Sequence, residues 1–387
     1  MVRARSATRA VRRVGAAEMT IEPLGIIPEE RLTFMPRNTV PRHEFCFWLH
    51  DQAARLLVEA SHSGQIEDWH EAVSSALSML DESIDERKTL SALAESGGTL
   101  CVPMKIDIFV AVLSDTLHFI YEALKTLEKR KFNVAFSLLR KPLTENLIIL
   151  SRLVADDDQF IRSFADGTFQ QKQVMQIDRS ERINLFNSVI GKLPVGSPFT
   201  GDLIDDIAFS KDAPNGLQIR MQQSTHLVTT RHPALLTPKL GINRIFFDEQ
   251  GDENYSAYDS LPTIILFILQ MSISKLSTYL ATDERSTNEI MVRALGIYSN
   301  LHPGKLDDMS QYLNRTLVDF FKCEWCEEGD AKIRKKHVAK FYLHDQIHCT
   351  RCDRQSHTPF TYMLRSGHLK IVESERIPNS EYVRLFG

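Results

Sequence analysis

Apolar positions along most of this chain recur at the spacing of amphipathic helices. The first such run begins at His43 and ends at Ser63-Gly64, with Phe45, Leu49 and Leu56 on one face. The same periodicity predicts further helices over residues 69–80, 105–128, 132–154, 159–164, 170–192, 215–232, 258–281, 286–299 and 305–321. The sequence therefore predicts a mainly α protein, built as a multi-helix bundle.

Three local features refine these helices. Pro142 lies inside the run 132–154 and should kink or break it, because proline removes a backbone donor. The acidic triplet 156–158 is predicted to cap the helix 159–164. The run from Leu261 to Met271 is strongly apolar but shorter than the ~20 residues that a bilayer requires. We therefore expect a buried core helix there and no membrane span.

Strand patterns are nearly absent before residue 330, apart from one short strand predicted over residues 242–247. Beyond residue 330, β-branched and aromatic residues predict strands over 338–344, 360–364 and 368–373. A small β module is therefore expected at the C-terminal end of the helical bundle.

The length and composition of the chain indicate how many domains it can form. The chain has 387 residues, 43% hydrophobic and 25% charged with a net charge of −4, which is typical of a globular protein with room for several domains. The first 17 residues contain five arginines and no acid, and Met19 is an alternative start, so whether residues 1–18 belong to the mature protein stays open. We expect a disordered or extended arm over 1–40, an N-terminal helical segment over 41–104, a helical bundle over 105–282 and a helical connector over 283–321. The last part, 322–387, contains two Cys-x-x-Cys pairs, and we expect a zinc ribbon there.

The ribbon is predicted from four of the six cysteines. Cys323 and Cys326 form one Cys-x-x-Cys pair, and Cys349 and Cys352 form a second after 22 intervening residues. Zinc prefers four thiolate or imidazole ligands in a tetrahedron, and each pair places two sulfurs on one tight turn. These four residues therefore predict one structural Zn²⁺ ion, and the scarcity of other cysteines favours a reducing, cytoplasmic compartment.

Other uses of the four cysteines have less support. The pairs could be redox-active, but such motifs occur next to a βαβ pattern, which this segment lacks. A site of three cysteines and one histidine, with His348 as the fourth ligand, is a further alternative. A catalytic zinc is disfavoured, because four thiolates leave no coordination position for water.

One rim of the predicted ribbon is basic. Lys332, Arg334, Lys335 and Lys336 lie near Trp325, and such residues could bind nucleic acid through phosphate contacts and base stacking. They could equally form a solvated hairpin tip, because acidic neighbours leave residues 322–354 only two charges positive.

A family resemblance concerns the helical part. The segment from Phe136 to Glu145, Phe-Ser-Leu-Leu-Arg-Lys-Pro-Leu-Thr-Glu, is followed in a later helix by Ser224-Thr-His226. This order resembles uncharacterised bacterial proteins with a HEPN-like helical fold, over about residues 105–282. The resemblance implies one of two roles. Many HEPN domains are metal-independent ribonucleases that act as dimers and use an Arg and a His separated by four to six residues, whereas others have lost the chemistry and serve as binding modules.

Arg220 and His226 satisfy the spacing that the resemblance implies. His226 would act as general base or acid, Arg220 would stabilise phosphate charge, and Glu145 would orient the imidazole or pair with the guanidinium. Against catalysis, Met221 stands where the active families usually have a polar residue. The alternative is that Arg220 is a surface residue and His226 a hydrogen-bonded residue of the bundle.

A buried ion pair is also expected near Glu145. Arg140 is one predicted partner, and Arg152, seven residues further on, is an equally plausible one. A charged cluster inside an otherwise apolar helix must be paired, whatever its function.

The functional expectation follows from these motifs and from those that are missing. The sequence contains no GxGxxG after a strand, no GxxxxGK[ST], no HExxH and no GxSxG, which disfavours nucleotide hydrolysis, dehydrogenases and common hydrolases. We expect a cytoplasmic zinc-containing interaction protein whose HEPN-like domain binds RNA or a protein partner in a defence or toxin-type system, as a candidate homodimer. The alternatives are a HEPN-type ribonuclease and a nucleic-acid-binding zinc ribbon.

Overall fold

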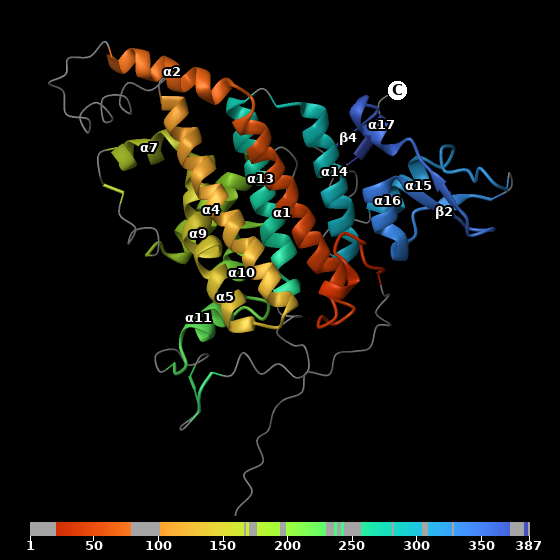
Figure 1. The fold of residues 1–387 in the computed structure, drawn as a ribbon, viewed down its shortest axis with the longest axis horizontal. Coiled ribbons are helices and arrows are strands. Elements are labelled where there is room, and N and C mark those ends of the chain that lie inside the picture. The colour runs from red at the N-terminus through yellow and green to blue at the C-terminus, as the bar shows by residue number, and fades with distance from the viewer. Residues whose placement is uncertain are drawn as a thin grey trace, which may run out of the picture.

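The protein is a helical bundle with a small three-stranded sheet near its C-terminal end (Figure 1). Its fold comes from a computed structural model. That structure describes residues 21–78, 101–165, 168–169, 176–193, 199–229, 236–237, 241–243, 257–280, 282–303, 309–326, 329–371 and 383–385. The expectations for residues 1–20 and for most of the predicted strand 242–247 therefore lie outside the described residues. The mainly α fold class with a terminal β element is confirmed.

Helix α13 (Leu261–Tyr279) is the centre of the bundle. Every residue from Leu261 to Ile273 is buried, because α1 (Val40–Ser61) and α14 (Glu284–Leu301) lie beside it and α4 and α6 pack on it as well. Among the described helices, it alone is long and apolar enough to cross a membrane, and 83% of its most apolar window is buried inside the protein. The predicted core helix is confirmed.

Two long helical stretches form the next layer of the bundle (Figure 1). Helix α4 (Val102–Glu128) packs along α5 (Phe132–Lys141) and against α1. Proline at position 142 does not break the second stretch. A π-helical turn, Pro142–Asn146, connects α5 directly to α6 (Leu147–Ala155), so the chain continues without a reversal. A single widened turn accommodates the proline ring and the missing backbone N–H without ending the helix.

Shorter helices cover this layer. These are α2 (Gln65–Ser78), α7 (Asp157–Ala165), α9 (Arg179–Ile190), α10 (Gly201–Ala208) and α11 (Gln218–Thr225). Asp156 caps α7 by accepting from the backbone N–H of Gln159 at 2.9 Å, as its sequence predicted. Asp178 caps α9 in the same way, so α9 begins at Arg179. Residues 170–175 of the helix predicted over 170–192 lie outside the described part.

The C-terminal module combines helices with two small sheets. Strands β1 (Ala331–Lys332), β2 (Gln346–Cys349) and β3 (Gln355–His357) form an antiparallel sheet in the order β1-β2-β3. A second sheet pairs β4 (Leu369–Ile371) with β5 (Val383–Leu385), which agrees with the strand predicted at 368–373 as far as residue 371. Before the sheets come helix α15 (Met309–Thr316), which packs on α14, and a turn to Phe321. The helix predicted over 305–321 therefore ends at Thr316, and its residues 305–308 lie outside the described part.

Two predicted strands of this module are wrong. Residues 338–344 form helix α16 (Val338–His344), preceded by the 3-10 turn Lys335–His337, and residues 360–365 form helix α17 (Phe360–Arg365). Phe341, Tyr342 and Phe360 are fully buried against one another and against the bundle. Burial of their aromatic rings overrides the strand preference of the sequence.

The module shares its core with the bundle through α14. Helices α16 and α17 both pack on α14 (Figure 1). A Cβ on Gly296 of α14 would collide with the Tyr342 ring, so only glycine permits this approach. Arg293, one turn earlier, donates to the backbone carbonyl of Tyr342 and to Asp345. The base of the C-terminal module is therefore part of one continuous core.

An N-terminal segment, residues 21–39, packs onto the bundle. The carboxylate of Glu44, which is fully buried in α1, accepts the backbone N–H groups of Leu24, Ile26 and Ile27 at 2.5, 2.9 and 3.2 Å. A short 3-10 turn, Glu29–Arg31, follows. This half of the expected arm is thus ordered, because a single acidic residue binds three otherwise unpaired donors.

Candidate metal centre and other site candidates

Two hairpins carry the four predicted cysteine ligands. In the first, Cys323 N–H donates to the carbonyl of Gly329 at 3.1 Å, and Lys322 pairs with Asp330. In the second, Cys349 N–H donates to the carbonyl of Arg354 at 3.0 Å, with Asp353 in the left-handed region at φ +56°. The pairing of β1 with β2 joins the hairpins and brings their tips together.

The four thiol sulfurs form one compact cluster that could hold a metal ion. All four Sγ atoms lie within 4.8 Å of one another. Cys323 and Cys352 are 3.6 Å apart, and so are Cys326 and Cys349. A tetrahedron with metal–sulfur bonds of ~2.3 Å has sulfur–sulfur edges of about 3.8 Å, so the cluster fits four thiolates around one ion.

Backbone hydrogen bonds favour the thiolate form of Cys349. Cys352 N–H and Arg351 N–H donate to Cys349 Sγ at 3.4 and 3.3 Å, and these bonds lower the pKa of the Cys349 thiol to about 6. The contact with the Cys349 thiol raises the pKa of Cys326 to about 12. A cation bound among the sulfurs would displace the thiol protons, since metal ligation requires thiolates.

Gly329 leaves the space that the sulfurs need. A Cβ at this position would lie 2.5 Å from Cys349 Sγ and 2.8 Å from Cys326 Sγ. The alternative ligand His348 lies outside the cluster, since its buried ring stacks on His337 with centroids 3.9 Å apart. The arrangement therefore favours the four-cysteine set over three cysteines and one histidine.

The two cysteine hairpins expose an aromatic residue, Trp325, next to the cation of Arg354, and we call this surface the ribbon tip. Trp325 is 60% exposed, its indole N–H donates to the Gln355 carbonyl at 3.1 Å, and the Arg354 guanidinium lies 5.4 Å from the centre of its ring. This contact holds the indole with one face toward the guanidinium.

The predicted basic patch is divided by the fold. Lys332, Lys335 and Lys336 are exposed. Arg334 instead pairs with Asp353 at 2.9 Å and donates to the Cys349 carbonyl at 2.8 Å. Arg334 therefore supports the second cysteine hairpin.

The predicted catalytic residues occupy different elements. Arg220 lies within α11, partly buried, and its guanidinium donates to Gln223 at 3.1 Å. His226 follows the last turn of α11 and is exposed, so the predicted helix 215–232 ends at Thr225. Glu145 is half-buried in the π-helical turn after α5, the helix on which α11 packs.

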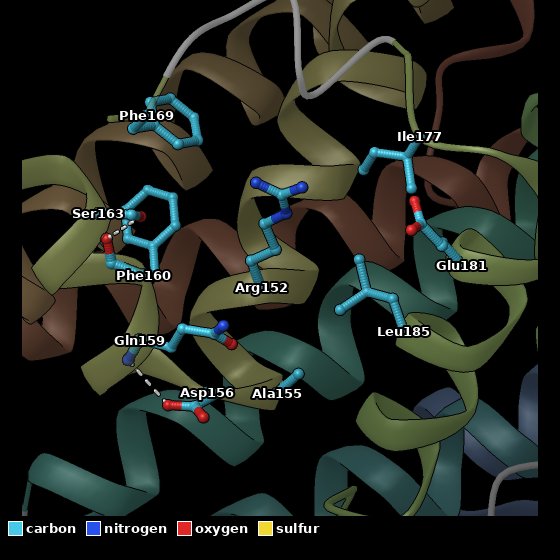
Figure 2. A pocket seen from close by; sticks show the side chains of 10 residues that line it. All are labelled: Arg152, Ala155, Asp156, Gln159, Phe160, Ser163, Phe169, Ile177, Glu181 and Leu185. Atoms are coloured by element: carbon cyan, nitrogen blue, oxygen red, sulfur yellow. Dashed lines mark hydrogen bonds between the residues drawn. The ribbon is translucent and has the colours of Figure 1, made fainter. Parts of the chain in front are cut away.

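The predicted buried ion pair of Glu145 with Arg140 or Arg152 is wrong. Arg140 is exposed on α5. Arg152 lies on α6 and points into a pocket of about 350 Å³ between α6, α7 and α9 (Figure 2). Sequence reasoning missed this pocket, because its walls come from three helices whose packing no local pattern specifies.

No protein family, no curated protein and no protein of solved structure matches this chain. The resemblance to HEPN-like proteins therefore stays a prediction that rests on the residues quoted for it.

Proposed function

We propose that this chain is a zinc-containing interaction protein. One zinc ion, bound by Cys323, Cys326, Cys349 and Cys352, would hold two hairpins in place for partner binding. The observation that carries the proposal is the compact cluster of four sulfurs within 4.8 Å, which closes the coordination shell of a tetrahedral ion. A closed shell suits a structural metal. The structure describes all six cysteines and joins none of them in a disulfide, in keeping with the reducing cytoplasm that the proposal implies.

The metal assignment is tested by elemental analysis of the purified chain. We expect one zinc per chain, and Cys349→Ser should abolish stoichiometric zinc, since it removes one of the four ligands. Cys101→Ser is the matched control, because Cys101 is another buried cysteine, at the N-terminus of α4, where serine is a favoured cap. Equal zinc content in both variants would contradict the site.

Single-stranded RNA is the partner class that the ribbon tip supports best. An exposed indole offers a stacking surface for a base, and Arg354 beside it offers charge for a phosphate. Stacking on an aromatic side chain contributes ~1–3 kcal/mol per base. Binding through this surface needs no base pairing and no metal chemistry.

Fluorescence anisotropy with a labelled single-stranded RNA tests this partner. Trp325→Ala should weaken binding by about five- to hundredfold. Reversal of Lys335 and Lys336 to Glu should weaken it further and reduce its salt dependence. Tyr362→Ala is the control, because Tyr362 is 66% exposed on α17. If Trp325→Ala binds as the parent does with zinc retained, the ribbon tip is not the RNA surface.

A HEPN-type ribonuclease is the second candidate. It is supported by the exposure of His226 and by the π-helical turn that carries Glu145, since such turns are frequent at functional sites. In this proposal Arg220 and His226 act on the phosphate and the ribose, in a homodimer and in a defence or toxin-type system. His226→Ala should then abolish RNA cleavage, whereas His62→Ala, at the exposed end of α1, should not. Cleavage that survives His226→Ala rejects this candidate, and light scattering tests the dimer.

A further inference from the structure

The pocket between α6, α7 and α9 lies on the side of the bundle opposite the ribbon (Figures 1 and 2). Arg152 reaches into it from α6, while Phe160 and Phe169 form one wall and Glu181 stands on the opposite wall. Its volume of about 350 Å³ suits a small molecule. Ligand pockets span ~300–1,000 Å³, so this one is at the small end of the range.

Arg152 is a partly buried cation with no contacting anion in the described part of the chain. Among the described residues, its guanidinium has no hydrogen bond and no ion pair, and burial lowers its pKa while Glu181 partly opposes that shift. Three other arginines of the described part have carboxylate partners. Arg182 binds Asp205, Arg293 binds Glu289 and Asp345, and Arg31 binds Glu128. A desolvated, unpaired charge is costly, and a ligand anion would remove that cost.

Glu181 supplies the opposite charge across the pocket. It lies in the first turn of α9, its backbone N–H is bound by the cap Asp178, and its exposed carboxylate forms no ion pair within the described part of the chain. Asp156, the other acid of the lining, uses its carboxylate to cap α7. The pocket therefore presents one available cation and one available anion on facing walls (Figure 2).

The space beside these charges is apolar and aromatic. Phe160 is 4% exposed and meets Phe169 edge to face, with ring centroids 5.2 Å apart. Phe169 is fixed by its N–H, which donates to the Ser163 carbonyl at 2.8 Å. Ile177 and Leu185 line the other side. A ligand that complements Arg152, Glu181 and the aromatic wall at the same time would need a negative charge, a positive charge and an apolar group.

We propose that this pocket binds a small zwitterion with an apolar side chain, of which a free hydrophobic α-amino acid is the simplest member. The ligand carboxylate would bind Arg152, whose planar guanidinium can donate two parallel hydrogen bonds to it. The ligand ammonium would face Glu181. The apolar side chain would lie against Phe160 and Phe169. This site is independent of the zinc cluster and of RNA binding.

Isothermal titration calorimetry on the full-length, zinc-loaded protein at neutral pH tests the proposal with three probes. L-phenylalanine carries both charges, 3-phenylpropanoate only the carboxylate, and phenethylamine only the ammonium. L-phenylalanine is expected to bind at least about tenfold more tightly than either single-charge probe, because each lost charged hydrogen bond costs roughly a factor of ten or more.

Variants identify the two charges. Arg152→Gln and Glu181→Gln should each weaken L-phenylalanine binding by about tenfold or more, and Arg152→Lys should restore part of the loss because the charge is kept. Arg162→Gln, an exposed arginine on α7 outside the lining, is the control and should bind as the parent does. Thermal unfolding confirms that each variant is folded.

Three results would overturn the proposal. The first is no heat of binding for L-phenylalanine at about 20 mM, well above the ~1 mM affinity expected of a weak metabolite site. The second is binding that Arg152→Gln leaves unchanged in a folded protein. The third is equal binding of 3-phenylpropanoate and L-phenylalanine with no effect of Glu181→Gln, which would make the site one for simple carboxylates.

Discussion

The ring of Tyr342 lies against the backbone of Gly296, in the space that a Cβ would occupy. Gly296 belongs to α14 of the bundle, and Tyr342 to α16, which is inserted between the first two strands of the ribbon. The hydroxyl of Tyr342 also meets Ser310 at 3.3 Å, and Ser310 is hydrogen-bonded to Asn300. One ring thus connects three segments of the chain.

Gly296→Ala is expected to destabilise the protein by about 1–3 kcal/mol, because the new methyl group forces the Tyr342 ring out of its site. Chemical denaturation measures this loss. Gly191→Ala is the control, since a Cβ there would meet only ordinary contacts at 3.7 Å. A second variant, Tyr342→Leu combined with Gly296→Ala, should recover part of the loss. An unchanged midpoint for Gly296→Ala would show that the two helices are not in close contact.

Gly329→Ala should weaken metal binding without removing a ligand. Its Cβ would lie 2.5 Å from Cys349 Sγ and 2.8 Å from Cys326 Sγ, so the sulfurs must move apart. We expect at least about a tenfold loss of zinc affinity, which corresponds to ~1.4 kcal/mol of distortion. Competition with a chromophoric chelator measures it, with Gly191→Ala as the reference variant. Unaltered affinity would mean that the first hairpin relaxes freely.

Asp157 should give the protein an acid-sensitive component of stability. Burial raises the pKa of its carboxyl, but hydrogen bonds from Lys275 and Tyr279 outweigh that effect and hold the pKa at about 2. Because the unfolded value is ~3.9, the contribution is complete above about pH 5 and is lost as the pH falls toward 2. It amounts to on the order of 2 kcal/mol.

Asp157→Asn should therefore lower stability at pH 7 and flatten its decline between about pH 5 and 2. The loss at pH 7 should exceed ~2 kcal/mol, since Lys275 and Lys105 keep buried charges without this partner. Asp158→Asn is the control. That side chain is 55% exposed, so its ion pair with Lys105 should contribute only ~0–1 kcal/mol. Urea denaturation across pH compares the two, and equal losses would contradict the assignment.

Glu44→Ala should release the N-terminal segment from the bundle. Its carboxylate binds three backbone N–H groups, and without it those buried donors lose their partners. We expect a loss of about 2–4 kcal/mol and new proteolytic cleavage between residues 21 and 39, read by mass spectrometry. Glu59→Ala, in the same helix but paired only with Arg55 on the surface, should leave both unchanged. Resistance to proteolysis in Glu44→Ala would assign the docking to the apolar residues instead.

Local sequence signals were sufficient for much of this fold. The apolar periodicity identified α1, α4, α13 and α14, and the Cys-x-x-Cys spacing identified the four cysteines that meet in one cluster. Asp156 was recognised as a cap, because capping depends on the residue and its near neighbours alone.

The failures concern interactions that only the tertiary structure creates. Phe341 and Tyr342 suggested a strand, yet they lie in a helix because α14 offers a surface for their rings. The sequence suggested that Arg152 is a buried partner of Glu145, yet Arg152 points into a pocket. The other walls of this pocket begin at Phe160 and Glu181, which lie eight and 29 residues further along the chain. No window of sequence contains both sides of such a contact.

Helix α16 fixes the C-terminal module to the bundle and leaves its two cysteine hairpins outside the shared core. Phe341 and Tyr342 of α16 are buried in the core that α14 also lines, while the two cysteine hairpins project beyond it (Figure 1). Residues at the hairpin tips can change without disturbing the bundle, provided that the four sulfurs and Gly329 remain. An engineered hairpin could therefore be grafted onto α16 while the helical core stays unchanged.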